Sequence, residues 1–133
     1  SSDLARLLQP NGKLFLVVMG RKCKWEQSYF LLKGNFQKAF RRLSNQTVDC
    51  AIGNITFNTF YYSPAEIQQI FSDEFDVSLI KPVAFFIPPS YLQNFFDNKK
   101  MFLKMLGWMD GLVRNFSLLA NHSDHYIIVL DKK

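Results

Sequence analysis

The densest apolar stretch of the chain lies close to its start, between two turn signals. Leu14 to Met19 is an unbroken run of apolar residues, so the alternation typical of a strand with one solvated face is missing. Pro10-Asn11-Gly12 precedes this run and Gly20 follows it; proline cannot continue a helix, and Gly12 can adopt a positive φ. The pattern predicts an interior strand, covered on both faces and paired along both edges.

Helical spacing lies on both sides of this strand. Asp3 to Leu8 has the pattern of a helix end that leads into it. From Trp25 to Leu43 apolar residues recur at helical spacing with basic residues between them, which predicts two short helices joined at Lys33-Gly34-Asn35. We interpret this region, about residues 21–45, as a helical insertion, followed by a polar, irregular segment from Asn45 to Asn54.

The clearest helix start in the sequence is at Ser63. Ile55 to Tyr62 alternates in the manner of a short extended segment and leads directly into it. Ser63 is placed as the N-cap, Pro64 occupies the first helical position, and Glu66 completes a capping box. We expect the helix to end near Ser72-Asp73.

The remainder of the chain predicts two strands and two helices. Phe75 to Ile87 is an extended run in which Pro82, lacking an N–H group, indicates an edge or a bend. Ser90 to Phe96 and Lys99 to Ser117 have helical patterns, and Met and Phe at core spacing in the second favour burial over a membrane-surface helix. Asp124 to Asp131 is apolar enough to lie between two other strands.

Composition and charge add one asymmetry. The chain has 133 residues, of which 48% are hydrophobic, so it fits one folded domain or part of one. The net charge is +5, yet Arg21 to Arg42 holds seven Lys and Arg against Glu26 alone and so carries the whole excess. Such a segment could meet a nucleic acid, an anionic lipid surface or an acidic substrate, or be the solvated side of a surface helix.

Several kinds of site find no support in the sequence. The glycines never form a Gly-x-Gly turn after a strand, which excludes a complete nucleotide site within this chain. Two Cys and two His offer no metal-ligand spacing. His122, Ser123, Asp124 and His125 are contiguous, unlike the spatial grouping of a catalytic triad. With neither a membrane span nor a signal-peptide pattern, we expect a cytoplasmic protein.

Five short pieces carry a family resemblance. They are Leu8–Leu14, Trp25-Glu26 with Ala39–Arg42, Tyr61–Glu66, Pro88–Leu92 and Asp124–Val129. In this order they resemble the C-terminal half of a class I S-adenosylmethionine-dependent methyltransferase. The first is similar to the family's Leu-x-Pro-Gly-Gly turn into the fifth strand, the third to the start of the helix before the sixth strand, and the last to the seventh strand. Asn11 stands where the family has a glycine, and asparagine tolerates a positive φ.

The resemblance implies an α/β fold, the C-terminal part of a Rossmann-like seven-stranded methyltransferase domain. Strands 5, 6 and 7 would be present with flanking helices, and strand 7 would run antiparallel between the other two. The cofactor S-adenosylmethionine would be bound mainly by the N-terminal half, whose glycine-rich loop and ribose-binding acid this sequence lacks. We therefore expect residues 1–133 to be a single partial domain, inactive alone.

The implied function is methyl transfer to a small-molecule or lipid-like acceptor, with this chain supplying the acceptor side. Trp25, Tyr29 and Phe30 could line a substrate cavity, but ordinary packing is the favoured interpretation for them. Glu26 is the local candidate base, with a salt bridge to Arg21 or Lys22 as its competing role, and no catalytic residue is identified. The residues that we expect to contact the acceptor are Met19, Arg21, Trp25, Glu26, Tyr29 and Tyr61.

Two other interpretations remain open from the sequence. One is a non-enzymatic interaction module that binds nucleic acid or anionic surfaces through residues 21–42, a partner class that the methyltransferase interpretation does not favour. The other is a homodimer in which two copies pair through the exposed edge of Lys13 to Met19, since an uncovered apolar edge invites association.

Overall fold

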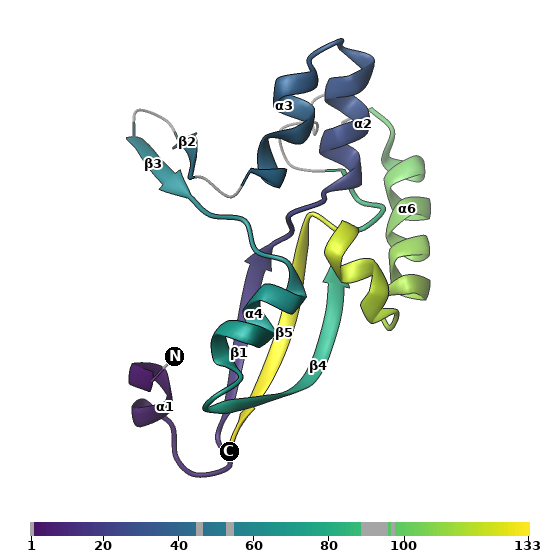
Figure 1. Cartoon of the computed structure of the whole chain (residues 1–133). Coiled ribbons are helices and arrows are strands. Elements are labelled where there is room, and N and C mark those ends of the chain that lie inside the picture. Colours follow the sequence, from purple (N-terminus) through teal and green to yellow (C-terminus); the bar gives the residue numbers. More distant parts are fainter. Residues whose placement is uncertain (1, 45–46, 53–54, 89–95, 97) are drawn as a thin grey trace.

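The fold is mixed α/β, a small antiparallel sheet with helices (Figure 1). The computed structural model describes residues 2–44, 47–52, 55–88, 96 and 98–133. The sheet has the order β1-β5-β4, formed by β1 (Lys13–Met19), β5 (His125–Lys132) and β4 (Phe75–Val83), and β5 is antiparallel to both neighbours. The prediction that the closing strand lies between two others is therefore confirmed.

The core lies on one face of this sheet. Tyr126, Ile128 and Leu130 of β5 are fully buried, and α4 (Pro64–Phe71) crosses the sheet over them (Figure 1). Further apolar side chains come from α1 (Ser2–Leu7), η3 (Ser117–His122) and β1. The buried core cluster consists of Ala5, Ile67, Phe71, Phe75, Ala120, Tyr126, Ile128 and Leu130.

β1 departs from the predicted interior strand. Its side chains alternate, with Leu14, Leu16 and Val18 packed on the core and Phe15 and Val17 about two-thirds exposed, at 65% and 67%. Within the described ranges β5 is its only strand partner, so β1 lies at the rim of the sheet. The apolar run could not distinguish these cases, because residue types do not show whether a second layer covers the other face.

The helical insertion forms as predicted. Its helices are α2 (Lys24–Leu32) and α3 (Phe36–Phe40), followed by the short η1 (Arg41–Leu43). Gly34 in the joint has φ 70°, a conformation that favours glycine. The prediction of an irregular segment from Asn45 to Asn54 is wrong. Within it lies β2 (Val48–Ile52), which pairs antiparallel with β3 (Ile55–Thr59) as a separate two-stranded sheet.

Local turn and cap signals are largely confirmed. Ser63 Oγ accepts the Glu66 N–H at 3.3 Å, and Glu66 Oε2 accepts the Ser63 N–H at 2.7 Å, which completes the capping box. In the turn before β1 the positive φ belongs to Asn11, at 62°. The sequence suggested a positive φ at Gly12, but Gly12 is not among the described residues that have one.

The segment after β4 differs from the predicted strand to Ile87. β4 ends at Val83, and Ala84 has φ 54°, which turns the chain away from the sheet. Pro82 lies opposite Tyr126 of β5, and β4 is an outer strand of the described sheet, one of the two positions that Pro82 indicated. The helix predicted at Ser90 to Phe96 falls mainly outside the described residues.

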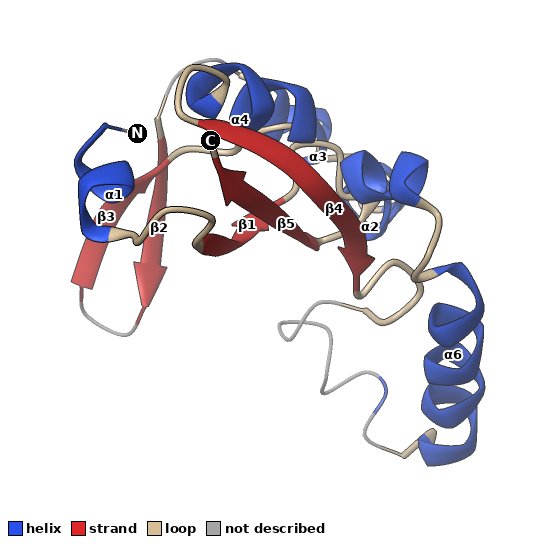
Figure 2. Cartoon of the chain, turned by 90° about the horizontal axis from the view of Figure 1, so that it is seen from below, coloured by secondary structure: helices blue, strands red, loops and turns tan. Residues whose placement is uncertain are grey.

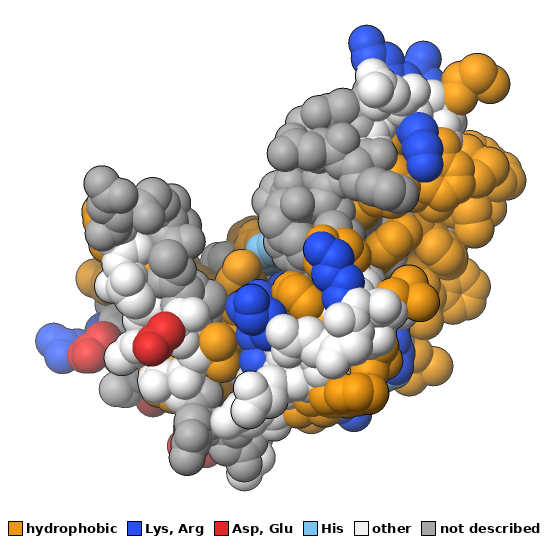
Figure 3. Space-filling model, turned by 90° about the horizontal axis from the view of Figure 1, so that it is seen from above, with side chains coloured by type: hydrophobic (Ala, Val, Ile, Leu, Met, Phe, Trp, Pro, Cys, Tyr) orange, Lys and Arg blue, Asp and Glu red, His pale blue; other side chains and the backbone are white. Residues whose placement is uncertain are grey.

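The long helix predicted near the C-terminus is α6 (Lys100–Val113), but its expected burial is wrong. Leu106 is the residue of α6 that is buried, and the helix projects away from the sheet (Figure 2). Met101, Met105 and Trp108 are exposed, and apolar side chains gather on the side where α6 lies (Figure 3). No helix in the described part of the chain is long and apolar enough to cross a membrane.

Candidate functional site

The candidate site lies where the chain leaves β1 and enters β5. Gly20 follows β1 directly, and its N–H donates to the Asp124 carbonyl at 2.8 Å. A Cβ atom at this position would lie 2.3 Å from the Ser123 carbonyl oxygen. Because this approach requires glycine, β1 ends tightly against the segment before β5, and α2 begins beside that segment.

A buried cluster of charges joins the insertion to this point. Glu26, which is 1% exposed, accepts from Arg41 Nε at 2.6 Å and from Arg42 Nε at 2.8 Å, one guanidinium on each carboxylate oxygen. Arg42 Nη2 also donates to Asp124 Oδ1 at 3.0 Å, and Nη1 donates to the Gly20 carbonyl at 3.2 Å. The cluster is held by charge-assisted hydrogen bonds on all sides of Arg42.

The pKa shifts of this cluster follow from burial and opposite charge. Burial would lower the pKa of Arg42, but the charges of Glu26 and Asp124, the hydrogen bond to Glu26 and the nearby Cys23 together raise that pKa. Burial would raise the pKa of Asp124, but the hydrogen bond from His125 and the charge of Arg42 lower it. Burial raises the pKa of the Cys23 thiol to about 11. Arg42 and Asp124 therefore stay charged and the Cys23 thiol stays protonated near neutral pH.

This arrangement corrects the expectations for Glu26. Its salt-bridge partners are Arg41 and Arg42, whereas the sequence suggested Arg21 or Lys22. Both carboxylate oxygens are engaged and the side chain is buried, so Glu26 does not present a base to a substrate. Arg21 pairs with Glu66 of the α4 cap. The charges of the insertion thus act largely as structural contacts.

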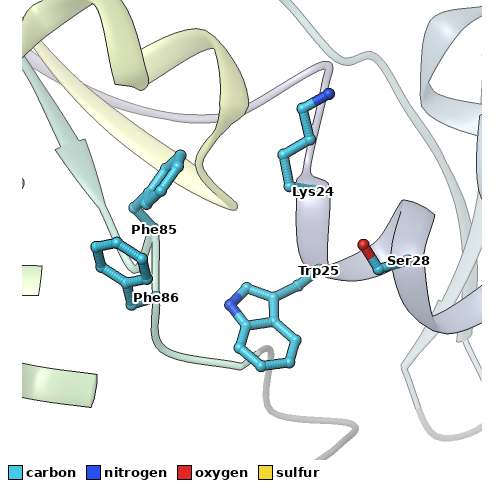
Figure 4. A pocket seen from close by; sticks show the side chains of 5 residues that line it. All are labelled: Lys24, Trp25, Ser28, Phe85 and Phe86. Carbon is cyan, nitrogen blue, oxygen red and sulfur yellow. The ribbon is translucent and has the colours of Figure 1, made fainter. Parts of the chain in front are cut away.

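A pocket of about 260 Å³ lies beside this cluster. Its walls come from the first turns of α2 and from the segment after β4 (Figure 4), and the lining residues are Lys24, Trp25, Ser28, Phe85 and Phe86. Since β1 and β4 are both antiparallel to β5, their carboxyl ends lie at the same edge of the sheet. The pocket is formed by residues that follow these two ends.

The aromatic walls are held in place by neighbouring contacts. The Phe86 N–H donates to Asp110 Oδ1 of α6 at 2.9 Å. The Trp25 ring meets Phe96 edge to face, with centroids 6.1 Å apart, and the Phe85 and Phe86 rings are also perpendicular, at 4.9 Å. Such edge-to-face pairs stabilise defined ring orientations.

The structure brings only some of the predicted contact residues to this pocket. Trp25 lines it. Met19 is partly exposed at the end of β1, on the same side of that strand as Phe15 and Val17. Tyr29 packs against Phe30 under Lys33, and Tyr61 is buried with the Arg42 guanidinium 4.8 Å from its ring centroid. Tyr61 therefore belongs to the buried cluster.

Sequence reasoning missed the residues on the far wall. Phe85 and Phe86 were interpreted as strand residues, and the turn at Ala84 that brings them to α2 has no glycine to mark it. Lys24 was counted only among the basic residues between Arg21 and Arg42, and Ser28 was not singled out. One sequence feature could have indicated the pocket. Phe85 and Phe86 come shortly after one apolar strand, and Trp25 comes shortly after another.

Gly20 directly follows β1, and the Ser123 carbonyl oxygen occupies the space beside its Cα. No group of three or more His, Cys, Asp or Glu that could hold a metal ion occurs among the residues described. The described part of the site is a mainly apolar pocket of a size that suits a small ligand.

Comparison with known proteins does not assign this chain to a family. Scanning against protein-family models gives no match, and a search of curated proteins gives none either.

Proposed function

We propose that this chain is the acceptor-binding part of an S-adenosylmethionine-dependent methyltransferase that acts on a small-molecule or lipid-like acceptor. The strand order is the observation that carries the proposal. β5, the last strand, is antiparallel between β1 and β4, the arrangement that the resemblance implies for strands 5, 7 and 6. The capped helix α4 before β4 and the left-handed Asn11 before β1 agree with it.

The position of the pocket also supports this proposal. In α/β sheets, ligands bind beyond the carboxyl ends of parallel strands. Trp25 follows β1 and Phe85 follows β4, so the pocket occupies that position for two strands that run in the same direction. A pocket there suits the part of the molecule that holds the acceptor.

In this proposal, the cofactor and the acceptor are bound by different segments of the enzyme. S-adenosylmethionine supplies an electrophilic methyl group when it is bound, and its binding residues would belong to another segment. The residues of this chain would bind the acceptor and hold its nucleophilic atom in orientation, which can account for a large part of the rate acceleration in a two-substrate reaction.

The alternative of a basic interaction module receives less support. Three of the seven cations in residues 21–42 pair with carboxylates inside the fold: Arg21 with Glu66, and Arg41 and Arg42 with Glu26. These charges are compensated within the molecule, which reduces the positive potential available to a polyanion.

Calorimetry tests the proposal directly. S-adenosylmethionine is titrated into the 133-residue chain and into a polypeptide extended by the residues encoded immediately before Ser1. We expect no measurable binding to the first and binding to the second, with a strand followed by Gly-x-Gly roughly a hundred residues upstream, a usual domain length. Transfer of a radiolabelled methyl group by the extended protein then tests the activity itself, because fold alone does not define function.

Two results would overturn the proposal. Tight S-adenosylmethionine binding by the 133-residue chain would contradict the proposed division of the site. Absence of both the upstream glycine motif and cofactor binding in the extended protein would remove the methyltransferase assignment.

A further inference from the structure

The pocket between α2 and the segment after β4 is apolar on one side and cationic on the other. Trp25, Phe85 and Phe86 supply three aromatic surfaces, and Figure 4 shows the Trp25 indole directed toward the two phenylalanines. Lys24 lines the same pocket, with its ammonium directed away from the rings (Figure 4). A ligand in the pocket therefore meets rings along its body and a positive charge at one end.

A second lysine, Lys22, acts on the same neighbour as Lys24. Burial, followed by the charges of Lys24 and Lys22, lowers the pKa of His122, so both lysines are near that imidazole. His122 Nδ1 is buried and has no hydrogen-bond partner among the described residues. Positive charge and an unused polar atom are thus concentrated on the side of the molecule where Lys24 lies.

Among the described residues, the carboxylates near the pocket do not cancel this charge. Glu26, the next residue after Trp25, is engaged by Arg41 and Arg42. Asp110 accepts the backbone N–H of Phe86, on the opposite wall from Lys24. Its charge would direct an anionic group away from that wall and toward Lys24.

We propose that this pocket selects a small amphipathic anion, with an apolar body between Trp25 and the Phe85-Phe86 pair and a carboxylate or phosphate at Lys24. The inference rests on the proposed function in treating this ligand as the methyl acceptor. A volume of about 260 Å³ lies below the roughly 300–1,000 Å³ of pockets for drug-sized ligands. The body is therefore one aromatic ring or a short aliphatic chain.

Intrinsic fluorescence gives a direct test, because Trp25 and Trp108 are the two tryptophans of the chain. In the Trp108→Phe variant the emission reports on Trp25 alone. Three probes with one phenylpropyl body are titrated at constant ionic strength: phenylpropanoate, phenylpropanol and phenylpropylamine. We expect the carboxylate to bind about two- to five-fold more tightly than the alcohol, as for one partly exposed ion pair, and the amine to bind most weakly.

Matched variants separate the two parts of the pocket. Lys24→Gln should remove the preference for the carboxylate while the alcohol still binds. Lys33→Gln, a lysine of the same insertion that stacks on Tyr29, should leave all three affinities unchanged. Phe86→Ala should weaken the three probes together, with Phe86→Leu as a second variant and far-UV circular dichroism as the check of folding.

The outcomes distinguish this inference from the proposed function. Equal affinities for the three probes, or a carboxylate preference that survives Lys24→Gln, would overturn the anion-selective pocket. If the preference follows Lys24 but the extended protein methylates no acceptor of this class, the ligand site stands and its role as the acceptor site is overturned. If the extended protein methylates acceptors without an anionic group equally well, the substrate class is overturned and methyl transfer stands.

Discussion

The guanidinium of Arg42 donates to the carboxylate of Asp124 at 3.0 Å, across 82 positions of the sequence. Arg42 lies in η1 at the end of the helical insertion, and Asp124 precedes the central strand β5. One buried side chain therefore connects the insertion to the sheet, and it does so next to Glu26 and the end of β1.

Replacing Arg42 by methionine should strongly destabilise the fold. The change leaves the buried carboxylates of Glu26 and Asp124 without their shared partner, which typically costs about 3–5 kcal/mol. Arg41→Met is the matched control, because Arg41 is more exposed and Glu26 keeps Arg42, so about 1 kcal/mol is expected. Urea unfolding followed by circular dichroism measures both, and equal losses would show that Arg42 is not the central ion of the cluster.

The stability of the chain should fall in acid partly through Asp124. Its pKa is lowered in the folded state by His125 and Arg42, against the effect of burial. Its contribution is therefore present above the ordinary Asp pKa and is lost as the pH falls through the lower, folded pKa. Urea unfolding from about pH 6 to about pH 3 should show this loss.

The variant Asp124→Asn serves as the reference for this pH dependence. It lacks the titrating group, so its stability should fall less steeply over the same range, while Glu66, whose pKa is also lowered, contributes equally to both proteins. Parallel curves for the two proteins would contradict the role given to Asp124.

The Cys23 thiol should be unreactive in the folded protein. Burial raises its pKa to about 11 from 9.0, which reduces the thiolate fraction near pH 8 by roughly 100-fold. In a Cys50→Ser background, reaction with a disulfide reagent should be at least this much slower in buffer than in denaturing urea. Comparable rates in the two conditions would mean that Cys23 is neither buried nor shifted.

Gly20→Ala should loosen the junction of β1 with β5. The added methyl group would lie 2.3 Å from the Ser123 carbonyl oxygen, a clash that requires backbone movement and costs about 2–3 kcal/mol. Gly107→Ala in α6 is the control, since its Cβ meets open space and alanine favours a helix by up to ~1 kcal/mol. A thermal melt of Gly20→Ala that matches the parent chain would contradict the close approach.

The free edge of β1 should promote association of two copies. Phe15 and Val17 are exposed on the strand at the rim of the described sheet, and such edges pair readily. Sedimentation velocity should show a concentration-dependent dimer that Val17→Lys abolishes. Leu32→Lys, an equally polar change at an exposed residue of α2, should leave the dimer intact; a monomer at all concentrations would remove this prediction.

The features that sequence reasoning predicted well are those encoded by neighbouring residues. The capping box of Ser63 and Glu66 and the helix joint at Gly34 each depend on a few adjacent positions. The central place of β5 was predicted from its run of apolar residues, Tyr126 to Leu130, which continues without a polar residue. Only the coarse α/β class follows directly from the structure; the larger methyltransferase domain stays a prediction.

The features that sequence reasoning missed depend on distant partners. Glu26 finds its cations 15 and 16 positions away and shares one of them with Asp124, and helical spacing within the basic segment does not reveal this. The pocket needs a positive φ at Ala84, a residue that gives no such signal. Of the predicted acceptor contacts, Trp25 alone lines that pocket.

The order of the three strands in the chain has a consequence for biosynthesis. Lys13 pairs with Asp131 and Phe75 with Lys132, so the strand that unites the sheet leaves the ribosome after both of its neighbours. At about 5–20 residues per second, β1 is translated on the order of ten seconds before β5. During that interval its apolar side chains lack the partner they have in the folded sheet, and we expect the nascent chain to depend on chaperones for that time.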